Sequence, residues 1–183
     1  AQSATEASTE ARTEAGKDIV VVNPTFCIDE FDTNLTTAQL LLPLARRQLP
    51  AYLPGRLNAV ATRDVGEGVA LAAEHGHSGS RYVLGGENLT SGALLERCAR
   101  VAGVPAPRRT MPIPLAEALS MVTEVVAYAT RTRPLFPMTG IRMIKHGQAV
   151  DIRTTREELG YEPNSLDEAI GRAYDWYRRE GHL

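Results

Sequence analysis

The chain has 183 residues, of which 43% are hydrophobic and 23% charged, and its formal net charge is −2. This composition is typical of a globular domain, its charge balance argues against a nucleic-acid or anionic-membrane surface, and no apolar run approaches the roughly 20 residues of a membrane helix. The polar start over 1–14 is unlike a secretory leader, so we expect a cytoplasmic protein in which Cys27 and Cys98 are free thiols.

The first predicted elements are a helix followed directly by a strand. Alanines recur every three or four residues over 3–15, which predicts a weak helix that ends at Gly16. The β-branched run over 19–22, closed by Pro24, predicts a strand buried on both faces, as in the interior of a parallel sheet. A helix and such a strand form half of an α/β unit.

The next segment is predicted to be a loop, a helix and a strand. The loop covers 25–33, after which Thr36 or Thr37 caps a helix that runs to about Leu49. The residues over 57–62 then predict a short strand.

A second helix and strand follow in the middle of the chain. Asp64 is predicted to cap a helix over 65–74, with Glu67 three residues later completing a capping box. A strand is predicted over 81–84, and the glycine pair 85–86 ends it.

Three helices are predicted in the C-terminal half. One runs from Thr90 or Ser91 through Ala102, and the last starts at Ser165 and ends near residue 180. Between them, the longest helix covers 114–132. We expect its apolar side chains to share one buried face: Leu115, Leu119, Val122, Val126 and Ala129.

Several stretches together suggest a family. They are Asp18-Ile-Val-Val-Val-Asn-Pro-Thr25, Thr62-Arg-Asp-Val-Gly-Glu-Gly-Val69 with the segment 81–90, and Arg156-Glu-Glu-Leu-Gly-Tyr-Glu-Pro163 with the segment 173–182. In this order they resemble the C-terminal half of extended short-chain dehydrogenase/reductases, the NAD-dependent epimerase/dehydratase group. The resemblance is greatest to its dihydroflavonol-reductase-like and hopanoid-associated sugar-epimerase-like branch.

This resemblance implies an α/β fold made of the remnant of a Rossmann-like parallel sheet and a mainly helical substrate lobe. We expect one domain over 1–183. In it, 1–25 and 57–85 supply sheet elements derived from the Rossmann fold, and 26–56 and 86–183 supply mainly substrate-lobe helices.

The sequence contains neither a glycine-rich cofactor loop after an apolar strand nor a Tyr-x-x-x-Lys pair. The register that the resemblance implies puts Gln2 at the position of the catalytic lysine, whose charge a neutral amide cannot replace. A slipped register in this helix is the alternative. We therefore expect no catalytic residue and no cofactor for this chain alone, although the resemblance implies NAD(P) for the family.

The resemblance also indicates which residues face a ligand. It implies a nicotinamide-side loop of Pro24, Thr25 and Phe26, and substrate-side residues Asn23, Phe26, Cys27 and Arg142. Arg142 either binds a substrate anion or is a solvated or core-bridging arginine. We expect no metal site, because the pair His75 and His77 has no third ligand in view.

The loop over 26–32 departs from the family pattern. Relatives have a Gly-Pro pair before an aspartate, and this chain keeps only the aspartate, Asp32. The loop is bulkier and more acidic, so we expect it to crowd a nicotinamide or repel an anionic phosphate. Alternatively, Phe26 and Ile28 simply plug a hydrophobic pocket.

Three functions fit these observations. The chain is the C-terminal substrate-binding portion of an NAD(P)-dependent epimerase, dehydratase or reductase-like protein, and is not redox-active alone. Alternatively, it is a standalone relative that acts as a non-redox isomerase, cyclase or small-molecule-binding module, or it is a protein–protein interaction module. Because an isolated buried strand would expose an apolar edge, we expect a homo-oligomer or a separate N-terminal Rossmann half as partner, besides a small-molecule ligand.

Overall fold

A computed structural model describes residues 18–130, 138–147 and 149–183. The predicted helix over 3–15, its end at Gly16 and the position of Gln2 lie outside the described residues. The chain folds as mixed α/β, as the sequence predicts, and its described strands form two small sheets. No helix in the described part of the chain is long and apolar enough to cross a membrane.

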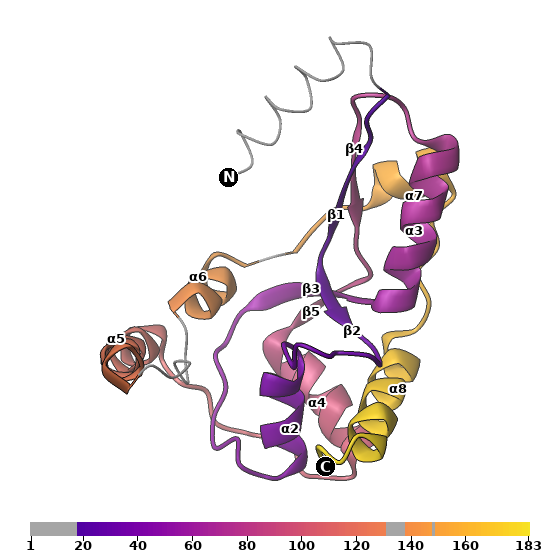
Figure 1. Ribbon diagram of the computed structural model, residues 1–183. Helices are drawn as coiled ribbons and strands as arrows, with labels where there is room; N and C mark the ends of the chain where they lie inside the picture. Colours follow the sequence, from indigo (N-terminus) through magenta and orange to yellow (C-terminus); the bar gives the residue numbers. More distant parts are fainter. Residues whose placement is uncertain (1–17, 131–137, 148) are drawn as a thin grey trace.

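The first sheet has two parallel strands, β1 (Val21–Pro24) and β4 (Arg81–Leu84). Helices α3 (Thr62–His75) and α7 (Arg153–Leu159) lie against it (Figure 1). They enclose a small buried cluster together with one side of β1 and β4: Ala72, Tyr82, Leu159 and Tyr161, with Val20, Val22 and Leu71 packed against them.

The second sheet joins three strands in the order β2–β3–β5. β2 (Phe26–Ile28) and β3 (Arg56–Ala61) are parallel, and β5 (Glu87–Thr90) is antiparallel to β3. β1 and β2 are separated by a single residue, Thr25, so the chain passes from one sheet to the other at this residue.

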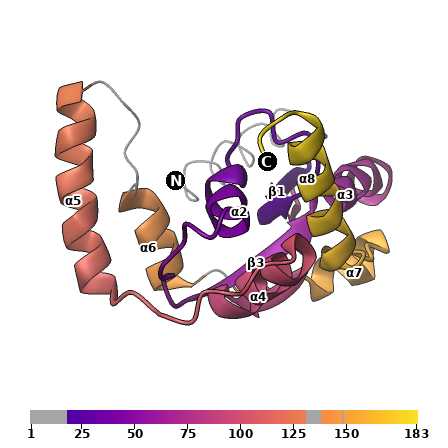
Figure 2. The same cartoon turned by 90° about the horizontal axis from the view of Figure 1, so that it is seen from below.

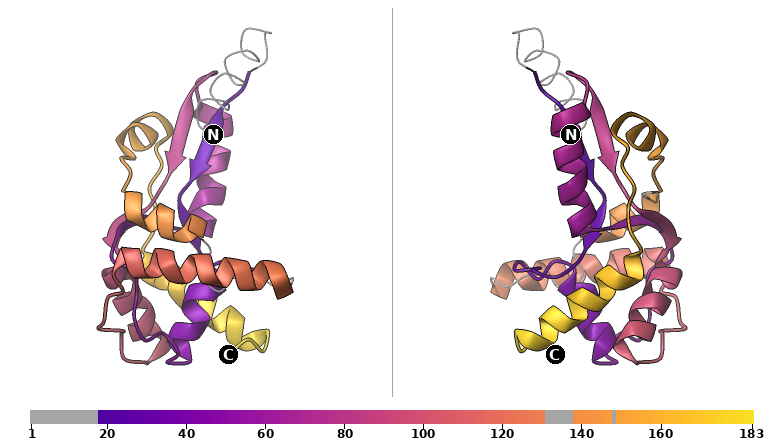
Figure 3. Two further views of the ribbon diagram at one scale, coloured as in Figure 1. Left: turned by 90° about the vertical axis from the view of Figure 1, so that its left-hand side faces the viewer. Right: turned by 90° about the vertical axis from the view of Figure 1, so that its right-hand side faces the viewer.

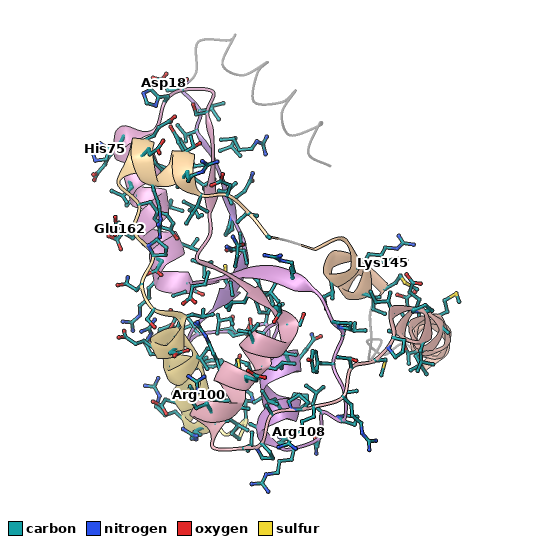
Figure 4. All side chains as sticks on the ribbon, turned by 180° about the vertical axis from the view of Figure 1, so that it is seen from behind. Asp18, His75, Arg100, Arg108, Lys145 and Glu162 are labelled. Atoms are coloured by element: carbon teal, nitrogen blue, oxygen red, sulfur yellow. The ribbon has the colours of Figure 1, made fainter. Side chains whose placement is uncertain are left out.

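Helices α4 (Ser91–Ala102) and α8 (Leu166–Arg179) pack on the second sheet, and α2 (Ala38–Ala45) packs on α4. The three helices form the main core with this sheet. Figure 4 shows this end of the molecule near Arg100 and Arg108, with Asp18 and His75 at the opposite end. Aliphatic side chains of α2 and α4 meet the aromatic face of α8 there: Leu41, Leu44, Leu94, Leu95, Ile170, Tyr174, Trp176 and Tyr177.

The remaining helices, α5 (Ile113–Thr130) and α6 (Met138–His146), pack on each other at one side of the molecule (Figures 2 and 3). The prediction that Leu115 and Leu119 lie on a buried face of α5 is wrong, because they are 52% and 39% exposed. Among the described side chains of α5 the buried ones are Ala116 and Ser120, and the helix packs on α6. Burial at the other three predicted positions, Val122, Val126 and Ala129, lies outside the described side chains.

Several predicted elements are confirmed with small shifts in their ends. β3, β4, α4, α5 and α8 occur where expected, and the Thr90 hydroxyl caps α4 by accepting from the N–H of Ala93 at 3.1 Å. Gly103, with φ 70°, ends that helix. The elements β2, β5, α6 and α7 were not predicted, because each is short and lacks a clear hydrophobic period.

The prediction that the first strand is buried on both faces is wrong. Val21, Val22 and Asn23 are half-buried and Pro24 is exposed, because among the described residues β1 has a strand on one edge only and helices on one face. The other face, with Val21 and Asn23 opposite Arg81 and Val83, is not covered by α3 or α7. A β-branched run thus indicates a strand correctly but does not show how many neighbours it has.

Asp64 does not cap α3. The helix begins two residues earlier, at Thr62, and Asp64 lies buried in its first turn. Its carboxylate accepts hydrogen bonds from the backbone N–H of Asn164 at 2.9 Å and from the Asn164 Nδ2 at 2.7 Å. Asp64 therefore connects α3 to the loop that precedes α8, 100 residues later in the chain.

We expect Asp64→Ala to lower the free energy of unfolding by about 1–2 kcal/mol, because both hydrogen bonds to Asn164 are lost. Glu67→Ala is the matched control, since Glu67 is exposed on the same helix and should change stability by less than about 0.5 kcal/mol. Urea denaturation of the two variants checks this. Equal losses would instead support the capping box.

Candidate functional site

A pocket of about 960 Å³ opens where the chain passes from β1 to β2. Ligands of open α/β sheets bind at the carboxyl ends of parallel strands, and this pocket begins there. Its lining comes from β1, β2 and β4, the loop that follows β2, the first residue of α3, and the segment after α6: Asn23, Pro24, Thr25, Phe26, Cys27, Asp29, Glu30, Phe31, Asp32, Thr36, Thr37, Thr62, Arg81, Val83, Gly147, Ala149 and Val150.

All but one of the candidate site residues line this pocket. The continuous segment from Asn23 to Cys27, which holds the three nicotinamide-side residues, forms one wall. Arg142 does not line it and is exposed on α6. Arg81 and Val150 could not be found from the sequence, because only the strand register and the path after α6 bring them to the pocket.

The buried carboxylate of the pocket loop is neutralised. Asp29 is 3% exposed and accepts two hydrogen bonds from Arg172 of α8, from Nε at 2.7 Å and from Nη2 at 2.9 Å. The N–H groups of Glu30 and Arg63 also point at it. Burial alone would raise the pKa of Asp29, but these hydrogen bonds and the Arg172 charge outweigh burial and hold that pKa below its usual range.

The other two acidic residues of the loop are also engaged. Glu30 pairs with Arg63 and, at 3.2 Å, with Arg179. Asp32 accepts from the backbone N–H groups of Thr36 and Ala38 at the start of α2, both at 2.9 Å. It also accepts from the Tyr177 hydroxyl at 2.9 Å. The loop is acidic in sequence, but its carboxylates hold α2, α3 and α8 together, so the reason for expecting it to repel an anion is removed.

The two apolar residues of the loop differ in position. Ile28 is fully buried in the main core, and Phe26 is half-buried against the same core while it lines the pocket. Phe31 lines the pocket with 68% of its surface exposed and a left-handed φ of 65°, which is costly for a residue with a Cβ. One apolar residue thus fills the core and two aromatic rings remain at the pocket.

Cys27 and Arg81 complete the polar lining. The Cys27 thiol lies 3.5 Å from the carbonyl oxygen of Thr25, and burial raises the pKa of this thiol, so it is a poor nucleophile. Arg81 is the only lysine or arginine among the lining residues, and it has no ion pair within the described part of the chain. No group of three His, Cys, Asp or Glu in the described residues could hold a metal ion.

Known proteins resemble this chain in sequence and in fold. A putative dihydroflavonol 4-reductase of Synechocystis is 35% identical over 92% of this chain and 50% of its own length. Sterol demethylase protein B of Methylococcus capsulatus is 30% identical over 92% of this chain and 52% of its own length. A solved nucleoside-diphosphate-sugar epimerase from Pseudomonas aeruginosa has a TM-score of 0.76 at 28% identity, over 98% of this chain and 54% of that one. No family model matches.

The chain belongs to the extended short-chain dehydrogenase/reductases. It corresponds to their C-terminal half and spans about half the length of the curated relatives it matches. The sheet of β1 and β4 is accordingly part of a Rossmann-like sheet.

We expect Arg172→Leu to lower the free energy of unfolding at neutral pH by about 2–3 kcal/mol, because it leaves the buried Asp29 carboxylate without its cation. Arg178→Leu, which removes an exposed i,i+3 pair on the same helix, should cost less than about 0.5 kcal/mol. Urea denaturation measures both.

The difference between wild type and Arg172→Leu should depend on pH. The lowered pKa of Asp29 means that its stabilising effect is present above the unfolded-state pKa and is lost as the pH falls through the folded-state pKa. The two proteins should therefore converge in stability at acidic pH. A difference that stays constant down to strongly acidic pH would contradict the assigned charge pair.

Proposed function

We propose that this chain is the substrate-binding portion of an NAD(P)-dependent epimerase, dehydratase or reductase-like protein, and that it carries out no redox reaction by itself. The observation that carries this proposal is the pocket that begins at the carboxyl end of β1 and extends along β4, next to a sheet edge that has no partner among the described residues. The similarity to known enzymes over half of their length supports it.

The unpartnered edge of β1 can be located in detail. The N–H of Val21 donates to Ser80 at 3.0 Å and that of Thr25 to Leu84 at 3.2 Å, so alternate residues of β1 face β4. In a β-strand the intervening residue, Val22, directs its N–H and C=O to the opposite edge. A further parallel strand can pair there, which is how a cofactor-binding half would complete the sheet.

The residues present fit the nicotinamide end of a cofactor rather than its phosphates. Pro24, Thr25 and Phe26 form a wall of the pocket in which Pro24 is exposed, while Thr25 and the aromatic ring of Phe26 are half-buried. The sequence has no glycine-rich phosphate loop, so the described residues could hold only the ring end. When bound, NAD(P) supplies or accepts a hydride. The role of this chain would be to position the ring and the substrate beside each other.

The pocket lining favours an uncharged substrate. The only basic side chain in its lining is Arg81, whereas the two negatively charged phosphates of a sugar nucleotide would need several basic groups to bind them. The lining also presents Phe26, Phe31, Val83 and Val150. We therefore favour a small hydroxy-ketone or ring-bearing alcohol over a sugar nucleotide. This agrees with relatives named for dihydroflavonol and sterol chemistry.

The first test is a titration of NADH or NADPH into the purified chain, with binding measured by nicotinamide fluorescence. We expect no micromolar binding to this chain alone, and binding when a separately expressed N-terminal half of the Synechocystis relative is added. Val22→Pro should abolish the restored binding, because it removes an outward N–H while the bonds of Val21 and Thr25 to β4 remain.

Two results would contradict the proposal. Micromolar binding of either nucleotide to the chain alone would show a complete cofactor site. Restored binding that survives Val22→Pro would show that the two halves do not join at the edge of β1. A circular dichroism spectrum of Val22→Pro that matches wild type serves as the control for folding.

A further inference from the structure

A buried asparagine lies behind the wall of the pocket. Asn58 is 1% exposed on β3, and its Oδ1 accepts from the Thr25 hydroxyl at 2.7 Å and from the N–H of Gly86 at 2.8 Å. Its Nδ2 donates to the carbonyl oxygen of Gly86 at 3.2 Å. Because one residue, Gly86, offers both a donor and an acceptor, the Asn58 amide fits in one orientation only.

A second asparagine fixes the same orientation from the other side. Asn88 lies directly opposite Asn58 in the β3–β5 pairing, and its Oδ1 accepts from the Asn58 Nδ2 at 3.0 Å. The Asn88 Nδ2 donates to the carbonyl oxygen of Val150 at 2.8 Å, and its Oδ1 accepts from the Val150 N–H at 3.0 Å. The backbone groups of Gly86 and Val150 thus set the direction of every hydrogen bond in this network. The network joins Thr25 to Val150 behind the pocket wall.

Glycines make the close approach to Asn58 available. A Cβ at Gly85 would lie 2.7 Å from the Asn58 Oδ1, and a Cβ at Gly86 would lie 2.4 Å from the carbonyl oxygen of Ala59. Both distances are too short for a side chain. The Gly85–Gly86 pair therefore ends β4 and also lets the Asn58 amide reach backbone groups.

The direction of these hydrogen bonds leaves Thr25 with no free hydrogen-bond donor at the pocket. Its hydroxyl proton goes to Asn58 and its backbone N–H to Leu84. Its carbonyl oxygen accepts from the Cys27 thiol. What the Thr25 side chain has left is the lone-pair capacity of Oγ1, which can only accept.

We propose that Thr25 is a specificity-determining residue that accepts a hydrogen bond, so that the ligand group placed against it must be a donor, an amide N–H or a hydroxyl. Asn58 and Asn88 act as positioning residues that hold this polarity. A ligand that presents only a carbonyl or ether oxygen at this point meets an acceptor and is discriminated against. The proposal rests on the proposed function, because it takes the pocket to be a ligand site.

The test uses two matched pairs of probes on the full chain, with threonine methyl groups labelled for NMR. Nicotinamide and methyl nicotinate differ by replacement of the amide N–H groups with an ester oxygen. Benzyl alcohol and benzyl methyl ether differ by loss of the hydroxyl proton. We expect the donor of at least one pair to bind about fivefold more tightly than its partner, as loss of one hydrogen bond implies. Selectivity in the first pair assigns the donor to a cofactor carboxamide, and selectivity in the second to a substrate hydroxyl.

Variants separate this effect from general binding. Thr25→Val should bring the affinity ratio close to one, and Thr25→Ser should retain it. Thr62→Val is the matched control, because Thr62 also lines the pocket and is exposed at the start of α3, so the ratio should not change.

The outcomes distinguish the two proposals. Equal affinities within both pairs, or selectivity that survives Thr25→Val, would overturn the acceptor role of Thr25 and leave the ligand site in place. Failure of all four probes to shift any pocket threonine would contradict the ligand site itself, and with it the acceptor role.

Discussion

The passage of the chain through Thr25 is the constraint on which the rest of the structure depends. Before this residue β1 pairs with β4, and after it β2 pairs with β3, so the two sheets diverge at a single residue. A divergence this abrupt leaves backbone and side-chain groups facing the gap, and buried polar groups need partners. Asn58 supplies them, and the space that remains between the sheets is the pocket.

The charges around this passage serve the same end. Asp29 and Glu30 face arginines of α3 and α8, and Asp32 holds the start of α2 and the Tyr177 hydroxyl. All of these contacts except that of Asp32 with the start of α2 join a residue near 30 to a helix far along the chain, so the loop after β2 is fixed by helices that fold around it. Breaking such a buried pair costs more than the pair contributes, which ties the pocket loop to the integrity of the main core.

Local patterns in the sequence identified most of the elements, and the family resemblance indicated the residues of one pocket wall. The β-branched run before Pro24, the Thr90 cap and Gly103 each act through neighbours in sequence, and the structure has the expected strand and helix there. Misassignments came where the deciding contact is distant. Asp64 has the spacing of a cap, yet its partner is Asn164. Leu115 and Leu119 have the spacing of a buried stripe, yet they are exposed, and α5 packs on α6.

The same reasoning explains why the polarity of the pocket could not be predicted. Asn58 and Asn88 are ordinary polar residues in short strands until the register places them opposite each other. The orientation of the two amides then depends on Gly86 and Val150, which take part through their backbone groups and not through their side chains. A hydrogen-bond direction set by backbone groups leaves no trace in residue types. The polarity of this pocket wall is therefore a property of the fold.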